Sequence, residues 1–228
     1  MAYIIFNEND SRNMGVSNIL NMPLASKAEQ KSDILYIPGR PEPIIDLKES
    51  FNPVSYVVEM EIKTGTNIRN ILSWLSGSGK LIFSDEPDKY YNAYSNSVVS
   101  TSRTNNKYYS MSVKFLCQPF AYAIDNDPIE ITTNNYALEV RGSYYSEPIY
   151  KIFGSGNITL KVNNTDKPLK LYDIDSYVTV DTSLLVCHKD KVFVKNSGFL
   201  PYLGAGTNLI QWGGNVSKIE VTKNERWK

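Results

Sequence analysis

Few residues in this chain have types and spacings that could perform chemistry. The single histidine, His188, directly follows Cys187. Neighbouring residues of a strand point to opposite faces, so these two side chains cannot act as nucleophile and general base in one pocket. One histidine and two distant cysteines also lack the paired-ligand spacing of a zinc site. We therefore expect no metal site, and we expect Cys117 and Cys187 to be reduced residues of the core.

Two glycine motifs lack the features of nucleotide-binding loops. Gly77-Ser-Gly-Lys80 ends like a P-loop, but Trp74 stands where that motif has its first glycine. A P-loop also follows a strand and opens a helix, whereas a predicted helix precedes this segment. Gly154-Ser-Gly156 lacks the third glycine and the following helix of a dinucleotide site, and is predicted to be a turn. No cofactor is therefore expected.

Two acidic clusters, Asp85-Glu-Pro-Asp88 and Asp125-Asn-Asp127, are the remaining candidates for chemistry. Neither has the full spacing of a calcium loop, so solvated turns are expected and calcium binding is the alternative. A glycosidase could draw paired carboxylates from distant strands, but nothing in the sequence marks such a pair. We assign no catalytic, metal-binding or cofactor-binding residue, and we predict that the chain is not an enzyme.

Aromatic residues make up 12% of the 228 residues, and 16 of them are tyrosines. Tyrosine favours strands and also interfaces, because it offers a broad apolar face with a polar tip. Two tyrosine groups, the first with nearby asparagines, could stack on sugar rings or pack across strands: Tyr90, Tyr91 and Tyr94 with Asn92 and Asn96, and Tyr144, Tyr145 and Tyr150. We favour packing or subunit contact and keep glycan binding as the alternative.

The composition and charge of the chain limit the kinds of partner that it could bind. Basic and acidic residues number 24 each, so the chain lacks the positive charge with which proteins bind nucleic acid. A division at residue 135 leaves twelve basic and fifteen acidic residues before it, and twelve and nine after it, an asymmetry too small to imply a polyanionic partner. Residues 1–10 lack the pattern of a signal peptide, and no apolar run approaches the roughly 20 residues of a membrane span. We expect a soluble protein without membrane insertion.

Most segments alternate with a period of two or are short β-branched and aromatic runs between turn residues, which predicts strands. The clearest examples are Ile34–Ile37, Ser55–Ile62, Tyr108–Leu116, Ala137–Val140, Asn157–Val162 and Lys218–Val221. Many short strands favour sandwiches or barrels over a parallel sheet with crossover helices. The predicted fold class is therefore mainly β.

One amphipathic helix is predicted over Asn67–Ser76. Its apolar residues fall at i, i+3, i+4 and i+7, so they form one stripe that should face the core. This stripe consists of Ile68, Ile71, Leu72 and Leu75. Thr66 is the expected N-cap, and Gly77 stands where a left-handed residue would end the helix.

Polar, proline-rich and glycine-rich segments divide the chain. Ile131–Asn135 reads as an exposed connection, which predicts one domain over 1–135 and a second over 136–228. The three prolines of Pro38–Pro43 exclude a central strand and predict an extended turn or arm. Gly213-Gly214 is predicted to be a turn between strands.

A series of motifs covers nearly the whole chain, and their order is more specific than any one of them. The motifs are Ile37–Arg40, Ile68–Ser76 followed by Gly79–Phe83, Tyr90–Tyr94, Ser146–Gly156, Tyr177–Asp181, Leu200–Gly204, Gly206–Asn208 and Arg226-Trp227. The series resembles the distal tail protein (Dit) family of long-tailed bacteriophages. After Arg40 this chain has Pro-Glu-Pro where relatives often have Asp or Asn and Gly, which leaves the shape of this loop open.

The resemblance implies a structural protein of two β domains. Domain 1–135 would be a β-sandwich or barrel-like domain that forms a hexameric ring, and domain 136–228 a galectin-like β-sandwich similar to carbohydrate-binding modules. The ring would connect the tail tube (major tail) protein to the tail-associated fibre or lysin protein and, in some relatives, anchor receptor-binding proteins. DNA would pass through it without specific binding. The chain would belong to the distal end of the virion tail after assembly in the host bacterial cytoplasm.

Within such a ring we expect apolar residues of Ile4–Phe6 and Ile34–Ile37 at or near subunit contacts. A galectin-like fold does not carry galectin activity, and His188 and Trp212 lie on separate segments without the galectin sugar pattern. A host-surface module that binds cell-wall glycan is the alternative function. A tail-associated wall hydrolase is a third, which requires distant carboxylates to converge.

Overall fold

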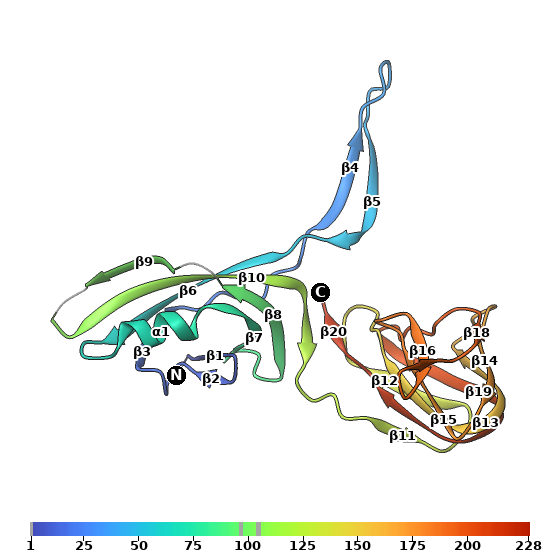
Figure 1. Ribbon diagram of the computed structural model, residues 1–228. Coiled ribbons are helices and arrows are strands. Elements are labelled where there is room, and N and C mark those ends of the chain that lie inside the picture. The colour runs from blue at the N-terminus through green and yellow to red at the C-terminus, as the bar shows by residue number, and fades with distance from the viewer. Residues whose placement is uncertain (1, 96–97, 104–105) are drawn as a thin grey trace. The chain divides into compact units, whose positions relative to one another are not determined.

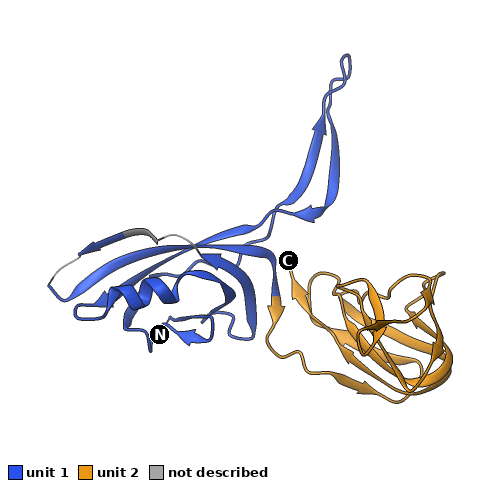
Figure 2. Cartoon of the chain, viewed as in Figure 1, with its two compact units in different colours: residues 1–121, 228 blue, residues 122–227 orange. Residues whose placement is uncertain are grey.

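A computed structural model describes residues 2–95, 98–103 and 106–228, which form a mainly β protein with one short helix (Figure 1). The predicted fold class is confirmed. The chain divides into two compact units: unit 1 comprises residues 1–121 with Lys228, and unit 2 comprises residues 122–227 (Figure 2). No helix in the described part of the chain is long and apolar enough to cross a membrane.

The division between the units precedes the predicted boundary at residue 135. Strand β11 (Ile129–Ile131) pairs with β19 (Gly206–Thr222), so the residues just before 135 group with unit 2. Counted at the observed division, unit 1 has thirteen basic and twelve acidic residues, and unit 2 has eleven and twelve. The charge asymmetry found for a boundary at 135 therefore disappears.

Unit 1 is built on one curved antiparallel sheet. Its strand order is β2-β1-β7-β8-β10-β6-β3, with β9 beside β10. The strands are β1 (Ile4–Phe6), β2 (Asn9–Asp10), β3 (Val16–Asn21), β6 (Val54–Lys63), β7 (Gly77–Phe83), β8 (Lys89–Ser95), β9 (Val98–Arg103) and β10 (Tyr108–Ala123). The last two residues of β10 already belong to unit 2. Strands β4 (Gln30–Leu35) and β5 (Ile44–Phe51) form a separate hairpin, which projects from the sheet (Figure 1).

Alternation along β6 and β10 gives the sheet a buried inner face and an exposed outer face. In register, Val58 faces Val113 and Met60 faces Met111, and all four side chains are buried. The residues between them point to the opposite side, where Leu116 of β10 is exposed. This period of two explains why Ser55–Ile62 and Tyr108–Leu116 were recognisable as strands.

The single helix, α1 (Ile68–Trp74), lies along the inner face of the sheet (Figure 1). The stripe prediction is confirmed by the burial of Ile71 and Leu75, while Trp74 adds a third buried side chain. The predicted N-cap is wrong: Asn67, not Thr66, caps the helix, because its side-chain oxygen accepts a hydrogen bond from the backbone N–H of Arg69 at 3.0 Å.

Replacing Trp74 by Phe should destabilise unit 1. The indole Nε1 donates a buried hydrogen bond of 2.8 Å to the carbonyl oxygen of Phe6, which ties α1 to β1. We expect W74F to lower the free energy of unfolding by about 1–3 kcal/mol, measured by urea denaturation with circular dichroism. The exposed helix residue Arg69 provides the control, because R69A should change stability by less than about 0.5 kcal/mol. Equal effects of the two variants would contradict this assignment.

Unit 2 is a second β structure held by two long strands, β13 (Ile149–Val162) and β19, which pair along most of their length. The sheet order is β11-β19-β13-β15-β16-β17, with β12 beside β19, β14 beside β13, and β18 beside β14. Strand β20 (Arg226–Trp227) pairs with β10 instead. The other strands of this sheet are β12 (Tyr136–Val140), β14 (Leu169–Ile174), β15 (Tyr177–Asp181), β16 (Val186–Lys189), β17 (Val192–Phe193) and β18 (Asn196–Ser197). Their inward side chains form one apolar cluster.

The predicted turn at Gly213-Gly214 is wrong, because both glycines lie inside β19. Here the pairing of β19 with β13 shifts register, and Gly214 has a φ of +97°. A Cβ atom at Gly214 would lie 2.4 Å from the carbonyl oxygen of Asn157. The two glycines therefore allow an irregularity within strand β19, where the backbones pack closely. They do not form a turn between two strands.

A buried carboxylate fastens the C-terminal segment of unit 2. Glu225 is 1% exposed and accepts hydrogen bonds from the Arg141 backbone N–H at 2.9 Å, the Arg141 guanidinium at 2.9 Å and Lys223 Nζ at 2.6 Å. Burial alone would raise the pKa of Glu225, but the hydrogen bonds from Lys223 and Arg141 outweigh it and lower the pKa below its usual value. The carboxylate is therefore charged when the protein is folded at neutral pH.

Candidate interaction surfaces

The β4–β5 hairpin, called the arm below, has one side on which the paired residues carry no charge. Ser32 pairs with Leu47 and Ile34 pairs with Ile45, so these four side chains lie on the same side, called the uncharged face. Ile34, Ile45 and Leu47 are 54%, 60% and 61% exposed. Isolated hairpins are marginally stable in water, and exposed aliphatic pairs add little to this one. The arm therefore presents apolar surface that nothing in the described part of this chain covers.

The other side of the arm, called the charged face, carries an ion triad. Asp33 pairs with Asp46 in the hairpin, and Lys48 Nζ lies 2.9 Å from the Asp33 carboxylate and 2.5 Å from that of Asp46. The hydrogen bonds to Asp46 and Asp33 raise the pKa of Lys48. Leu35, which is 58% exposed, and Ile44 occupy this face nearer the tip. Burying the charged face against a partner would cost the hydration of three charges, whereas burying the uncharged face would not.

The arm bears out one structural prediction and corrects another. Pro38–Pro43 forms the tip of the hairpin, as expected of an extended arm, and Ile34–Ile37 is exposed. Ile4 and Phe6, by contrast, are fully buried in β1, where Phe6 stacks edge-on against Phe115 with ring centroids 5.2 Å apart. They belong to the core of unit 1, so these two side chains cannot themselves touch another subunit, and only a position near a contact stays a prediction.

A groove lies on the outer face of unit 1, beside the root of the arm. It has a volume of about 560 Å³, and none of the eleven described residues that line it carries a charge. Phe51 and Pro53 form its wall at the root of the arm, and Tyr94 and Leu116 contribute side chains that are 46% and 43% exposed. The polar part comes mainly from Asn92, whose side-chain amide donates to Gln118 at 3.1 Å.

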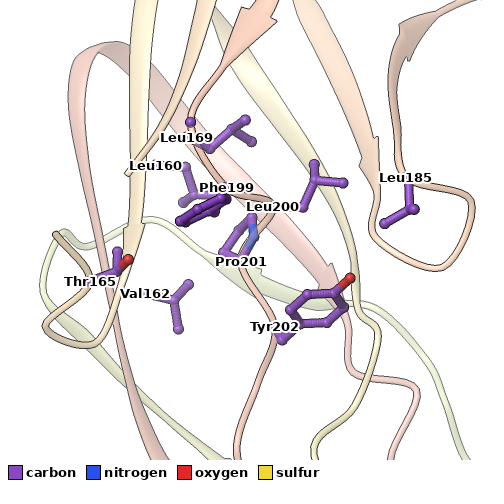
Figure 3. A pocket seen from close by; sticks show the side chains of 10 residues that line it. Leu160, Val162, Thr165, Leu169, Leu185, Phe199, Leu200, Pro201 and Tyr202 are labelled. Carbon is purple, nitrogen blue, oxygen red and sulfur yellow. The ribbon is translucent and has the colours of Figure 1, made fainter. Parts of the chain in front are cut away.

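A second, more apolar cleft of about 610 Å³ lies in unit 2 (Figure 3). Its floor is formed by the buried core residues Leu160 and Leu169, and its exposed rim includes Phe199. Of the ten described residues that line it, only Thr165 and Tyr202 have polar side-chain atoms. Sugar sites need several oriented polar groups, so this lining suits an apolar group better than a sugar ring.

One tyrosine from each of the two aromatic groups is packed inside its unit. Tyr91 stacks edge-on against Tyr56 and Phe83, and Tyr150 is fully buried with its hydroxyl donating to the Pro201 carbonyl at 3.1 Å. Tyr94, in contrast, is exposed in the groove of unit 1. Of the remaining residues of these groups, Asn96 lies outside the residues that the structure describes.

The residues considered for chemistry stay apart. Cys187 is buried in the core of unit 2, while the neighbouring His188 lies half-buried on the other side of β16. Glu86 of the first acidic cluster pairs with Lys89 at 2.9 Å, and Asn126 of the second bonds Asn224 at 2.6 Å. Among the described residues, no three His, Cys, Asp or Glu side chains are grouped to hold a metal ion.

Comparison with known proteins shows what this architecture is similar to. Residues 23–117 match the family model of the phage tail protein RIFT-related domain. The structure is similar to SPP1 Dit, described as a paradigm of the hub adsorption apparatus in phages infecting Gram-positive bacteria, with a TM-score of 0.75, 14% identity and 100% of both chains covered. The chain carries a phage tail domain and is Dit-like in fold. The resemblance to the distal tail family is thereby confirmed at the level of the fold.

Other comparisons are more distant. Chains in two structures of the phage p2 baseplate in its activated conformation, with Sr and with Ca, have TM-scores of 0.48 and 0.46, each at 9% identity. The matches cover 97% of this chain and 97% of that one in the first structure, and 100% and 98% in the second. No curated protein matches the sequence. In this Dit-like chain the arm and most of the groove fall inside the matched tail domain, whereas unit 2 lies outside it and is covered only by the similarity in fold to SPP1 Dit.

The surfaces include two residues that the sequence did not single out, Ile45 and Leu47. The hydrophobic residues on each side of Pro38–Pro43, Ile34–Ile37 before it and Ile44–Leu47 after it, could have signalled a hairpin. The groove left no comparable signal, because its lining comes from four separate stretches of sequence, 51–53, 78–79, 92–94 and 116–119.

Both cysteines of the Dit-like chain should resist thiol reagents while it is folded. Cys117 and Cys187 are free and buried, and burial raises the pKa of Cys117 to about 12 and that of Cys187 to about 11. The reactive thiolate is therefore scarce at pH 8. We expect mass spectrometry to find no adduct after an hour with a maleimide under native conditions, and two adducts in denaturant. Rapid labelling of the native chain would contradict the burial described here.

Proposed function

We propose that this Dit-like chain is a structural hub at the distal end of a phage tail. It forms a hexameric ring between the tail tube protein and the tail-associated fibre or lysin protein, and DNA passes through the ring without specific binding. The single observation that carries the proposal is the uncovered apolar face of the arm, which lies within the phage tail domain.

The energetics favour self-association through the arm. Full burial of a Leu or Ile side chain contributes about 1.5–3 kcal/mol, so covering three that are a little over half exposed would contribute roughly 3–5 kcal/mol per contact. A contact between different surfaces of identical subunits repeats head to tail and can close into a ring. The other parts of unit 1 would supply the rest of each interface.

The hub acts by assembly and not by catalysis. The match to a phage tail domain supports a structural role in the virion, and the residues considered for chemistry lie apart within the described chain. Unit 2, proposed to be a galectin-like sandwich, would carry attachments such as receptor-binding proteins. The glycan-binding alternative has less support, because the cleft of unit 2 is lined mainly by apolar side chains.

The test is the mass of the purified chain by light scattering after gel filtration, alone and mixed with tail tube protein. We expect a species of six 25.8 kDa subunits in at least the mixed sample. A monomer in both samples, together with binding to Gram-positive wall polymers in a pull-down, would overturn the hub and establish the glycan-binding alternative.

A further inference from the structure

Two exposed tyrosines of unit 2 lie beside an ion pair. Tyr145 and Tyr202 are 39% and 41% exposed, and their rings meet edge to face with centroids 5.6 Å apart. The Arg226 guanidinium lies 4.7 Å from the centroid of the Tyr145 ring and 3.1 Å from the Glu147 carboxylate. The two rings and the ion pair therefore form one cluster, called the tyrosine cluster below.

The ion pair of the tyrosine cluster is held in place by its buried member. Arg226 is 5% exposed, and its Nε donates to the carbonyl oxygen of Tyr145 at 2.6 Å while its Nη2 donates to Oε1 of Glu147. The Glu147 side chain is 35% exposed. No other group in the described part of the chain donates to its carboxylate. The carboxylate is thus fixed, balanced in charge and still able to accept a hydrogen bond from outside.

The tyrosine hydroxyls add further polar groups without partners. Within the described part of the chain, the hydroxyls of Tyr145 and Tyr202 form no hydrogen bond. Burial and the nearby Glu147 carboxylate raise the pKa of Tyr202, so its hydroxyl is protonated and can donate at neutral pH. The Tyr202 ring also stands at the margin of the apolar cleft (Figure 3). The tyrosine cluster therefore offers aromatic surface together with donors and an acceptor that this chain leaves unused.

We propose that the tyrosine cluster binds a neutral sugar ring, one unit of a polysaccharide. A pyranose has a face of C–H groups that packs on an aromatic ring, and hydroxyls around its edge that pair with tyrosine hydroxyls and a carboxylate. An acidic sugar would be repelled by Glu147, and a basic ligand would compete with Arg226 for the same carboxylate, so a neutral ligand fits best. The apolar cleft lacks such oriented polar groups. The inference adds a ligand site to unit 2 and does not depend on the ring.

Saturation-transfer difference NMR on the full chain tests the site. The probes are glucose, galactose, N-acetylglucosamine and N-acetylgalactosamine at up to about 20 mM, a range that detects millimolar dissociation constants. The variant Y202A removes one ring, and E147Q removes the charge of the acceptor while keeping its shape. The matched control is Y136A, because Tyr136 is an exposed tyrosine of unit 2, at 37%, outside the tyrosine cluster. Circular dichroism reports whether each variant is folded.

We expect at least one of the four sugars to bind the parent and Y136A equally, and to bind Y202A and E147Q at least fivefold more weakly. Because Tyr202 and Glu147 are partly exposed, both variants should fold as the parent does. No signal from any of the four sugars would overturn the site. Parent-like binding by both Y202A and E147Q would also overturn it, by placing the sugar elsewhere. Light scattering on the same samples reports the ring separately, since its assembly is assigned to unit 1.

Discussion

The variant Ile45→Lys is expected to convert the assembled protein to smaller species. Ile45 lies at the centre of the uncharged face of the arm, between Ile34 and Leu47. A lysine there would place an ammonium group in the apolar contact that we propose, at a cost of about 2–4 kcal/mol per contact. That cost corresponds to a roughly 30- to 1,000-fold weaker association. Gel filtration with light scattering over a concentration series measures the change.

The matched control is Leu35→Lys, on the charged face. Leu35 has nearly the same exposure as Ile45 and lies in the other strand of the arm, but its side chain points to the side of the ion triad. Since both residues are exposed, either substitution should change the stability of the monomer by less than about 0.5 kcal/mol. We expect L35K to assemble as the parent does. Equal loss of assembly in both variants would contradict the assignment of the contact to the uncharged face of the arm.

The variant Glu225→Gln is expected to destabilise unit 2 by about 2–4 kcal/mol at pH 7. The buried carboxylate accepts from Arg141 and Lys223, and a glutamine would turn an amide N–H₂ toward donors and remove the charge that they bind. Urea denaturation followed by circular dichroism measures the loss. Glu220, whose ion pair with Lys218 is partly exposed, is the control, and E220Q should cost less than about 1 kcal/mol.

The same carboxylate predicts a pH dependence. The pKa of Glu225 is lower in the folded chain than in the unfolded chain. The stabilisation that its carboxylate contributes is therefore fully present above the ordinary glutamate pKa of about 4.3. It is lost as the pH falls through the pKa of Glu225 in the folded chain. The difference in stability between the parent and E225Q should therefore shrink below about pH 4. A difference that stays constant from pH 7 to pH 3 would contradict the ion network.

The sequence predicted elements whose signals are local. The stripe from Ile68 to Leu75 located the helix, and the alternation of Ser55–Ile62 and Tyr108–Leu116 located the two long strands of unit 1. The prolines of Pro38–Pro43 located the tip of the arm, because they cannot donate to a ladder. Each of these patterns needs only the chain neighbours to be interpreted.

Features that depend on distant partners were missed or misread. Ile4–Phe6 and Ile34–Ile37 are similar apolar runs, yet the first is buried because β1 lies between β2 and β7, while the second is in a hairpin that pairs only with itself. Gly213-Gly214 has the composition of a turn, but both residues lie inside β19. The backbone of Asn157 packs so closely against Gly214 that the strand is irregular there. The side of the arm on which Ile45 lies follows from its register with Ile34, which the sequence does not fix.

The central claim, a ring-forming tail hub, is tested most directly by negative-stain electron microscopy of the purified chain in the presence of tail tube protein. The account predicts class averages with six-fold symmetry and a central opening, and their loss in I45K but not in L35K. Particles that remain single and without symmetry at all concentrations, with I45K indistinguishable from the parent, would contradict it.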